Sequence, residues 1–499
     1  MSDVVVIGAG PAGALAALRA AELGARTTLV SSAEFGGMAA NEGPVPVRAF
    51  AYAARLMRDA RQLQRYGITE SEPVLDYARL LARVREIVHD VGTHTALRER
   101  VDALGVSLHE RSGVASFEDP HTIQTERGLR LRADRFIICT GGVSRRLGVP
   151  GIELTHSHSD IWNATEVPTS MLVVGSGQTG VQVASMFNAF GTRVQLFEAG
   201  PRILRSEDDD VAAAVANALR DSGVVVHERF GTITSFEKTL TGVRLNYRNG
   251  QHEGHAEAAL AMVAAGWVSD TAGLNLAKAG VAVDANGTIE VDEFLRTSVP
   301  HIFAAGDVTG RLMLVPGAVE DGFVAATNAV QGPTQPLRHR VSPSGSFTHP
   351  EHAQVGLTEA QARKSHDVVA TVVPFDGAVR AIIEGRTFGF CKLVVDRPSF
   401  RILGCHVVGE RAMETVQLAA VAIAAGMRVD DLARVAVSFP TYAEVLVHAA
   451  VCAAAELRLP LGGLAARAGG QRQADVNATL ITRNRKERLC IDSKEKWAS

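Results

Sequence analysis

The sequence has no long apolar run, no closely spaced cysteines and no excess of charge of either sign. Its five cysteines stand far apart, without the Cys-x-x-Cys spacing of redox or zinc sites, so we expect neither a disulfide scaffold nor a bound metal. The apolar stretch near the N-terminus is about five residues long, too short for a signal peptide or a membrane span. We therefore expect a cytoplasmic protein. The cysteines are Cys139, Cys391, Cys405, Cys452 and Cys490.

Charge and aromatic content exclude further classes. Lys and Arg number 51 against 54 Asp and Glu, a formal net charge of −3, so no global basic field exists to bind nucleic acid or an anionic membrane. Aromatic residues make up 5% and glycines number 47, a mix that favours closely packed helices and glycine turns over a β-sandwich. At about 150 residues per domain, the 499 residues predict roughly three domains.

Two glycine-rich segments each follow a strand pattern and precede a helix pattern. Gly-Ala-Gly-Pro-Ala-Gly at 8–13 follows the β-branched run at 4–7, and Gly-Ser-Gly-Gln-Thr-Gly at 175–180 follows an apolar run at 171–174. One such motif is weak evidence, but two in this context are strong. The helices are expected to end at Leu23 and about Phe190, and the next strands to cover 27–30 and 194–197.

Each glycine in this motif has a physical role. The first permits the tight turn, the second lets the backbone approach a pyrophosphate, and the third lets helix and strand pack closely. The positive end of the helix dipole then attracts the phosphates. Two copies predict an α/β fold with two Rossmann-like domains that bind two dinucleotides, as an enzyme passing hydride between nicotinamide and flavin requires.

The strand ends indicate which nucleotide binds. Glu198 ends the second strand of the second unit, where a carboxylate accepts hydrogen bonds from a ribose 2′-OH and repels a 2′-phosphate, so NADH is favoured. Arg193 and Arg202 are expected to flank this site and keep NADPH as an alternative. Ser31 stands at the equivalent position of the first unit.

The remaining chain shows two further patterns. Asp307 ends an apolar strand, where it can bind the polyol of a flavin ribityl chain or serve as a buried capping carboxylate. From about Pro343, strand patterns alternate with Ala-rich helices, which indicates an α+β domain. The stretch at 462–499 is expected to be a flexible polar tail, with a polybasic arm as the alternative. The expected strands are 370–373, 391–395 and 402–408, and the clearest helix is 414–425.

Taken together, these motifs resemble the pyridine nucleotide-disulfide oxidoreductases, the flavoproteins that include lipoamide dehydrogenase, glutathione reductase and mercuric reductase. The resemblance covers about residues 3–457. It also rests on Phe-Gly-Gly at 35–37, Cys-Thr-Gly-Gly at 139–142, Ala-Gly-Asp-Val at 305–308, Phe-Thr-His-Pro-Glu at 347–351, Val-Gly-Leu-Thr at 355–358 and Ile-Leu-Gly-Cys-His at 402–406.

The resemblance implies FAD in the first site, NAD(P)H in the second, and a homodimer. It assigns 1–155 and 271–338 to an FAD-binding domain, 156–270 to an NAD(P)-binding domain and 339–461 to a dimerisation domain. The implied FAD site comprises Gly8, Gly10, Pro11, Ala12, Gly13, Ser31, Gly36, Gly37, Arg48, Ala115, Thr140, Gly141, Asp307 and Val315. The implied nicotinamide nucleotide site comprises Gly175, Gly177, Gln178, Gly180, Glu198 and Gly266.

Two departures concern the family's disulfide chemistry. The family places a Cys-x-x-x-x-Cys pair beside the flavin, and here Ala39 and Pro44 occupy those positions, so no thiol exchange can occur there. The family also uses a histidine, oriented by a glutamate, to handle the thiol proton. Phe439 stands in place of that histidine, while Glu444 remains. Losing both halves of one mechanism indicates a changed function.

Three further substitutions lie where the resemblance places groups near the flavin. Arg48 and Gln182 replace a Lys-Glu ion pair, and an arginine there can stabilise negative charge on reduced flavin. The alternative is a surface arginine and a helix-facing glutamine. Gln178 stands where several relatives place a shielding aromatic side chain, which leaves the nicotinamide side more open.

We therefore expect a thiol-independent, FAD-dependent NAD(P)H oxidoreductase, with Arg48, Gln182, Phe439 and Glu444 at its active site. The small apolar groups in place of thiols suit a flat hydrophobic acceptor such as a quinone, unless the pocket is simply filled. The alternatives are a soluble transhydrogenase-like enzyme, flavin-dependent chemistry on a carbon substrate, and a non-catalytic FAD-binding redox sensor or subunit. The expected partners are a small-molecule electron acceptor and a second copy of the chain, with no stable membrane insertion.

Overall fold

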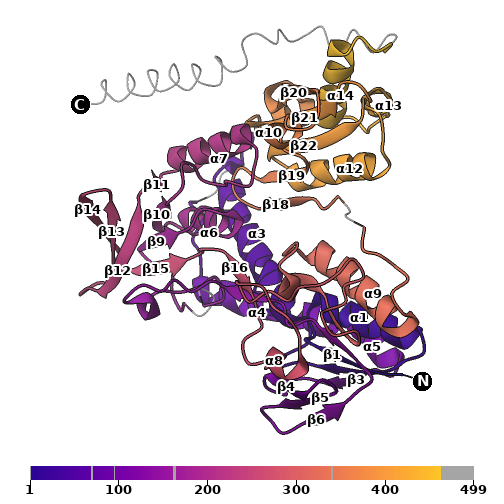
Figure 1. Ribbon diagram of the computed structural model, residues 1–499. Coiled ribbons are helices and arrows are strands. Elements are labelled where there is room, and N and C mark those ends of the chain that lie inside the picture. Colours follow the sequence, from indigo (N-terminus) through magenta and orange to yellow (C-terminus); the bar gives the residue numbers. More distant parts are fainter. Residues whose placement is uncertain (1, 69–70, 95, 161–163, 339–340, 462–499) are drawn as a thin grey trace, which may run out of the picture. The chain divides into compact units, whose positions relative to one another are not determined.

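The computed structural model describes residues 2–68, 71–94, 96–160, 164–338 and 341–461, and these form two compact units (Figure 1). The first unit covers the chain up to Val355 and returns at Val407–Val416. The second covers Gly356–His406 and the chain from Gln417 on. The predicted tail at 462–499, which includes Cys490, lies outside the described residues. Among the helices described, none combines the length and the apolar character needed to cross a membrane.

A parallel five-stranded sheet forms the first half of the first unit. Its order is β17-β7-β1-β2-β3, and both faces of β1 are buried because successive side chains alternate between two cores. Val4 and Val6 contact one core, Val5 and Ile7 the other. The strands are β1 (Asp3–Ile7), β2 (Arg26–Val30), β3 (Ser107–His109), β7 (Arg135–Ile138) and β17 (Ile302–Ala304).

Helices cover one face of this sheet and a small antiparallel sheet covers the other. The first core packs α1 against α9, with α5 beside α1, as Figure 1 shows. Their close approach follows from their alanine-rich faces. The opposite core lies under β4-β5-β6 and α8. The bounds are α1 (Pro11–Glu22), α5 (Ala96–Ala103), α8 (Leu276–Ala279), α9 (Val315–Gln331), β4 (Ala115–Asp119), β5 (Thr122–Thr125) and β6 (Arg130–Arg132).

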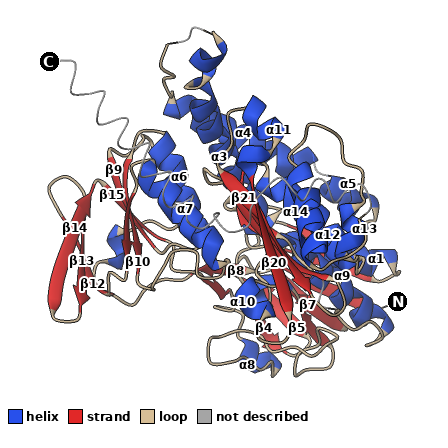
Figure 2. Ribbon diagram, turned by 90° about the horizontal axis from the view of Figure 1, so that it is seen from above, coloured by secondary structure: helices blue, strands red, loops and turns tan. Residues whose placement is uncertain are grey.

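A second parallel sheet, of order β11-β10-β9-β15, repeats the plan after the second glycine segment. The antiparallel sheet β12-β13-β14 packs on it through an apolar core, and the helices α6 and α7 contact its strands (Figure 2). The bounds are β9 (Ser170–Val174), α6 (Gln178–Ala189), β10 (Arg193–Glu198), α7 (Asp209–Asp221), β11 (Val225–Glu228), β12 (Thr232–Lys238), β13 (Val243–Asn249), β14 (His252–Ala258) and β15 (Leu260–Val263).

The chain returns to the first sheet after completing the second. β17 pairs in parallel with β7, and β16 pairs in antiparallel fashion with β8. Residues far apart in sequence are thereby brought to one region. The remaining elements of this unit are α2 (Gly37–Asn41), α3 (Pro44–Ala60), α4 (Tyr77–His94), β8 (Gly142–Ser144), β16 (Trp267–Ser269), β18 (Ser344–Ser346) and β19 (His352–Gly356), whose last residue begins the second unit.

The second unit contains an antiparallel pair, β20 and β21, with β22 beside β21, and α14 packs on β20 and β21. Cys391 and Cys405 are fully buried on β21 and β22, as expected for core thiols. The bounds are α10 (Glu359–Ala362), β20 (Val368–Pro374), α11 (Val379–Ile383), β21 (Gly389–Asp396), β22 (Ile402–Gly409), α12 (Ala412–Ala424), α13 (Val429–Ala433) and α14 (Glu444–Glu456); β22 and α12 each continue into the returning segment 407–416 of the first unit.

A reciprocal cap begins α10. The Thr358 hydroxyl accepts from Gln361 N at 3.2 Å, and the Gln361 side chain accepts from Thr358 N at 3.0 Å. Thr358→Ala removes one acceptor, so we expect the free energy of unfolding to fall by about 1 kcal/mol, measured by urea denaturation. Thr358→Ser, which keeps the hydroxyl, should unfold within a few tenths of a kcal/mol of the parent, and equal losses in both variants would contradict the capping explanation.

Candidate active site

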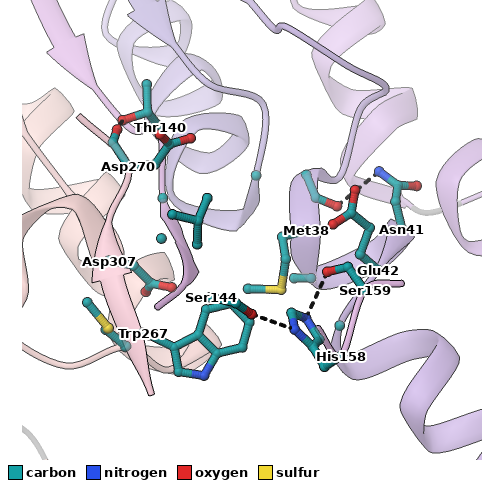
Figure 3. A pocket seen from close by; sticks show the side chains of 18 of the residues that line it. Met38, Asn41, Glu42, Thr140, Ser144, His158, Ser159, Trp267, Asp270 and Asp307 are labelled. Atoms are coloured by element: carbon teal, nitrogen blue, oxygen red, sulfur yellow. Dashed lines mark hydrogen bonds between the residues drawn. The ribbon is translucent and has the colours of Figure 1, made fainter. Parts of the chain in front are cut away.

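One cavity of about 810 Å³ lies inside the first unit. The start of α1 and the start of α6 contribute to its wall. So do the α2–α3 segment and the β8–β16 pair, which Figure 3 shows through Met38, Ser144 and Trp267. Its volume is within the range of protein sites for small molecules and cofactors. The first glycine loop, the start of α6 and the returning chain therefore surround a common space.

The first glycine loop is fixed by two close backbone approaches. A Cβ on Gly8 would lie 2.2 Å from the Cys139 carbonyl oxygen, and a Cβ on Gly13 would lie 1.8 Å from the Gly8 carbonyl oxygen. Gly8 also has φ +105°, a region that side chains disfavour. Only glycine permits this packing of strand, turn and helix.

The second glycine loop repeats the same geometry. A Cβ on Gly175 would lie 2.3 Å from the Ala264 carbonyl oxygen, and one on Gly180 would lie 1.9 Å from the Gly175 carbonyl oxygen. Gly177 is extended at the N-cap of α6, as Gly10 is at that of α1. The two motifs predicted from sequence thus form equivalent strand–loop–helix units, each with free N–H groups at a helix start.

Two glycines leave room for a ligand. Added Cβ atoms at Gly10 and Gly141 would meet no protein atom within 4 Å, and both residues line the cavity. The openness of these positions differs from the tight packing at Gly8 and Gly13. Backbone can therefore approach a bound molecule closely at the first site, as the middle glycine of the motif requires.

The structure brings most of the expected FAD-site residues to this cavity. Glycine-loop residues, strand ends and the start of α9 all reach its wall, together with the start of α6. The wall includes Gly8, Gly10, Pro11, Ala12, Ser31, Gly37, Arg48, Ala115, Thr140, Gly141, Gln178, Gln182, Asp307 and Val315. The other expected residues of the first unit, which lie outside the wall, are Gly13, Gly36, Gly175, Gly177, Gly180, Glu198 and Gly266.

Arg48 and Gln182 contact the same residue, Phe347, one at its ring and the other at its backbone. The Arg48 guanidinium carbon lies 3.1 Å from the centre of the Phe347 ring, and Gln182 Oε1 accepts from Phe347 N at 2.8 Å. Burial lowers the pKa of Arg48 to about 10, with Glu351 and Glu414 acting in the opposite direction, so the side chain is charged at neutral pH. Its Nη1 is buried without a hydrogen-bond partner. This arrangement supplies a positive charge to the cavity wall.

The segment before Arg48 is divided between two helices. Ala39 lies in α2, and Pro44 begins α3 after the short break at Glu42 and Gly43. A Cβ on Gly43 would lie 2.4 Å from Met38 Sδ, so the break packs closely against the preceding helix. Ala39, Pro44 and Met38 all line the cavity. This part of the wall is therefore free of thiols and apolar at Met38, Ala39 and Pro44, with the polar Asn41 and Glu42 between them.

Carboxyl and hydroxyl groups line the side formed by the returning chain. Asp307 lies just beyond β17, as predicted, and burial raises its pKa to about 6, with the neighbouring Asp321 acting in the same direction. Asp321 accepts from Gly306 N at 3.2 Å. Thr140 Oγ1 donates to the Asp270 carbonyl at 2.6 Å (Figure 3). The Asp307 carboxyl thus faces the cavity with little compensation from protein donors.

A buried histidine that no sequence motif indicated lies in this wall. His158 Nδ1 lies 2.9 Å from Ser144 Oγ, its Nε2 lies 3.2 Å from Ser159 Oγ, and its ring packs edge-on to Trp267 (Figure 3). Burial lowers the pKa of His158 to about 4, so the ring is neutral at physiological pH. The one signal in the sequence was that Trp267, which packs on His158, directly follows Gly266, an expected site residue.

Arg193 and Arg202 were both expected to flank the second nucleotide site, and the structure contradicts this for Arg193. Arg193 starts β10 and Glu198 ends it, so Arg193 lies at the opposite end of the strand and does not flank the site. Arg202 donates to the carbonyls of residues 203, 204, 205 and 207 and pairs with Asp209 at 2.8 Å. Glu198 accepts from Ser176 Oγ at 2.5 Å and from Gly200 N at 2.6 Å.

Phe439 and Glu444 belong to the second unit. The Phe439 side chain is 74% exposed, and Glu444 Oε1 accepts from Val379 N at 3.0 Å, at the start of α11. Tyr442 is buried and donates its hydroxyl to Glu384 at 3.0 Å. Glu444 therefore holds backbone in a chain that has no histidine at position 439 for it to orient.

Comparison with known proteins identifies the family. Residues 2–322 match the pyridine nucleotide-disulphide oxidoreductases, and residues 342–450 match the dimerisation domain of that family. The chain belongs to this family of flavoprotein oxidoreductases, which use FAD and NAD(P)H. The family predicted from the sequence motifs, its α/β fold and its flavin cofactor are thereby confirmed.

Individual relatives cover nearly the whole chain. A dihydrolipoyl dehydrogenase from Thermus scotoductus is 34% identical over 462 residues, which span 90% of this chain and 96% of that protein. A mercuric reductase from Bacillus cereus is 30% identical over 452 residues, spanning 89% and 70%. The solved structure of the HOCl-induced flavoprotein disulfide reductase RclA from Escherichia coli gives a TM-score of 0.79 at 25% identity, over 90% of this chain and 99% of that one.

The cavity fits FAD on structural grounds. The open positions at Gly10 and Gly141 would admit the diphosphate to the start of α1, and the Asp307 carboxyl would accept hydrogen bonds from polyol hydroxyls. Arg48, with its unpartnered Nη1, would face the electron-accepting ring.

Two glycines of the first loop separate folding from cofactor binding. Gly13→Ala places a methyl group against the Gly8 carbonyl, so we expect a loss of stability of about 1–3 kcal/mol, measured by denaturation of flavin-free protein. Gly10→Ala meets no protein atom, so flavin-free stability should be unchanged while FAD binds at least about ten-fold more weakly in fluorescence titrations. Normal FAD affinity in Gly10→Ala would contradict the assignment of this loop.

Proposed function

We propose that this protein is a thiol-independent NAD(P)H oxidoreductase that passes electrons from NADH through FAD to a non-disulfide acceptor such as a quinone. The observation that carries the proposal is the wall formed by Ala39 and Pro44, which supplies no thiol beside the expected flavin ring. Two relatives are named as a mercuric reductase and a flavoprotein disulfide reductase. The wall without thiols supports a different electron acceptor for this protein.

The one cysteine of the cavity wall does not replace a redox pair. Cys139 is 4% exposed and packs beneath the first glycine loop, with its Cβ 3.2 Å from the position of a Cβ on Gly13. Burial, with Asp321 acting in the same direction, raises the pKa of its thiol far above the ordinary value. The reactive thiolate form is therefore disfavoured.

The second site supports a preference for NADH. The Glu198 carboxylate stands at the end of β10, where it can accept from a ribose 2′-OH and repels a 2′-phosphate. The guanidinium of Arg202 is held by backbone carbonyls and Asp209, so it is not oriented to bind a 2′-phosphate. These contacts weigh against the transhydrogenase alternative, which requires both nucleotides to bind one site.

The proposal gives tasks to Arg48, to the two residues that support it and to Phe439. When bound, FAD accepts a hydride equivalent from the nicotinamide and delivers two electrons to the acceptor. Arg48 stabilises the negative charge that accompanies reduction, and Phe347 and Gln182 hold its position. Phe439 carries no titratable proton, so the acceptor must take its proton from water, as a quinone can.

We also propose the domain arrangement and a homodimer. The return of β17 to the first sheet supports an interleaved FAD-binding domain at 1–155 and 271–338, around an NAD(P)-binding domain at 156–270. The match of residues 342–450 to the family's dimerisation domain supports a homodimer built through 339–461. Phe439 and Glu444 are proposed to act near the partner's flavin.

Anaerobic spectroscopy tests the reaction. We expect the bound flavin to bleach with NADH, more slowly with NADPH, and to reoxidise with a benzoquinone but not with lipoamide or glutathione disulfide. The two-electron reduced enzyme should lack the long-wavelength charge-transfer band of a thiolate against flavin, because Ala39 and Pro44 supply no thiolate. Failure to bleach with either nucleotide would refute the oxidoreductase assignment, and reoxidation by a disulfide would refute thiol independence.

Restoring the two cysteines tests whether the missing proton donor at position 439 also prevents disulfide reduction. The double variant Ala39→Cys, Pro44→Cys should reduce disulfides at less than about one hundredth of the rate expected for a cysteine pair that has the family's histidine beside it. The reason is that Phe439 still supplies no proton. Adding Phe439→His to the same chain should raise the rate by a factor of about 10²–10⁴ if the relay is the missing element. Stopped-flow reoxidation with lipoamide measures both, and full activity in the double variant alone would contradict this explanation.

A further inference from the structure

A buried carboxyl lies next to the second glycine loop and takes no part in the proposed electron transfer. Glu207 is 2% exposed and precedes Asp208, the N-cap of α7. Its Oε1 accepts from Gln178 Nε2 at 3.2 Å and from Ser206 Oγ at 3.4 Å. Its Oε2 is buried with no hydrogen-bond partner. An ionised carboxylate with one unsatisfied oxygen is costly at such a position.

Gln178 connects this carboxyl to the nucleotide site. It is the first residue of α6, follows Gly177 at the N-cap, and lines the cavity. Its backbone carbonyl accepts from Ser346 Oγ at 3.2 Å, which fixes its place in the wall. A diphosphate at the start of α6 would therefore lie within a side chain's length of the Glu207 carboxyl. Two negative groups at this distance repel each other.

Surrounding charges do not neutralise Glu207. The charge of Arg202 acts on Glu207, but its guanidinium is shared among backbone carbonyls and Asp209. Its hydrogen bond to Glu207 goes to the backbone oxygen, at 2.9 Å. At the end of β10, the Glu198 side chain accepts from Ser176 Oγ and Gly200 N. Asp208 follows Glu207 directly and also disfavours its ionisation.

Together these groups let the Glu207 carboxyl take up a proton near neutral pH. Burial raises its pKa to about 7, while the hydrogen bonds from Gln178 and Ser206 and the charge of Arg202 act in the opposite direction. An anionic diphosphate nearby adds a further upward shift. Protonation removes the repulsion and keeps the carbonyl oxygen as an acceptor for Gln178.

We propose that Glu207 is a positioning residue that couples uptake of one proton to the binding of pyridine nucleotide at the second glycine loop. The inference rests on the proposed function only in placing the nucleotide at this loop. Free enzyme with ionised Glu207, one proton and one nucleotide give a complex in which the carboxyl is neutral and still accepts from Gln178. No covalent bond to the nucleotide forms and no electrons move.

The sign of the pH dependence follows from linkage. Because the bound nucleotide raises the pKa of Glu207, affinity is greatest below the pKa of the free protein, about 7, and falls as pH rises through the interval up to the pKa of the complex. A shift of one pKa unit on binding corresponds to about a ten-fold change in affinity across this interval.

Calorimetric titration of the oxidised, FAD-loaded full chain with NAD⁺ tests the proposal without turnover. Titrations from pH 6 to 9, in two buffers of different ionisation enthalpy, give both the Kd and the number of protons taken up. For the parent chain we expect the Kd to weaken about ten-fold across this range and a fractional proton to be taken up near pH 7.5. Glu207→Gln should bind at pH 8.5 as tightly as the parent does at pH 6.5, with no proton uptake.

Two further variants make the outcome specific. Glu207→Asp, which keeps an ionisable group, should retain the pH dependence with a shifted midpoint, and this also serves if the Gln variant does not fold. Glu253→Gln, on the exposed strand β14, should behave as the parent chain. Proton uptake that persists unchanged in Glu207→Gln, or a pH-independent Kd in the parent, would overturn the inference.

The two proposals fail separately. Tight NAD⁺ binding without pH dependence removes the role of Glu207 and leaves the oxidoreductase intact. Reoxidation of the reduced flavin by disulfides removes the proposed acceptor class and leaves the proton coupling intact. Absence of any NAD⁺ binding overturns the role of Glu207 and the placement of the nucleotide together.

Discussion

The structure of the first unit depends on four glycines whose missing side chains let backbone meet backbone. At each loop the first glycine lies against the carbonyl of the residue just after a neighbouring parallel strand, Cys139 after β7 or Ala264 after β15. The last glycine of each loop lies against the first. Any Cβ at these positions would overlap an oxygen atom. The starts of α1 and α6 are thereby fixed against their sheets. This packing determines where the cavity between them lies.

The same framework separates what the backbone supplies from what the side chains supply. Helix starts and open glycines such as Gly10 offer N–H groups to a diphosphate without any charged side chain. Side chains then determine the chemistry. Arg48 brings a positive charge that Phe347 and Gln182 hold in place, while Ala39 and Pro44 bring none of the thiols of disulfide exchange. The proposed change of reaction would therefore require few changes to the fold.

The repeated elements could be predicted because they depend on local pattern. The strands at 4–7 and 171–174, the two helices after them and the strand before Asp307 all stand where periodicity and glycine spacing placed them. The long helices α3 and α4 and the sheet β12-β13-β14 were not predicted, because their amphipathic and alternating patterns lack such a marker.

Contacts between distant segments were the part that sequence could not provide. The expectation for Arg193 was wrong because closeness in sequence to Glu198 ignores the direction of β10, whose two ends they occupy. His158 joins Ser144 and Trp267 only after β8 pairs with β16, more than a hundred residues away. Glu207 is buried because the loop after β10 folds back on the second glycine loop, through Leu204 N and the Ser176 carbonyl.

Two buried charged groups of the first unit behave differently, Arg48 in the cavity wall and Glu207 beside the second glycine loop. On the flavin side, Arg48 keeps its charge because its pKa, although lowered, is far above neutrality, so its contribution is constant over physiological pH. On the nicotinamide side, Glu207 has a pKa near neutrality and no dedicated cation, so its charge changes over the same range. A fixed positive charge suits a group that must become negative on reduction. A titrating negative charge suits a site that an anion enters and leaves in each turnover.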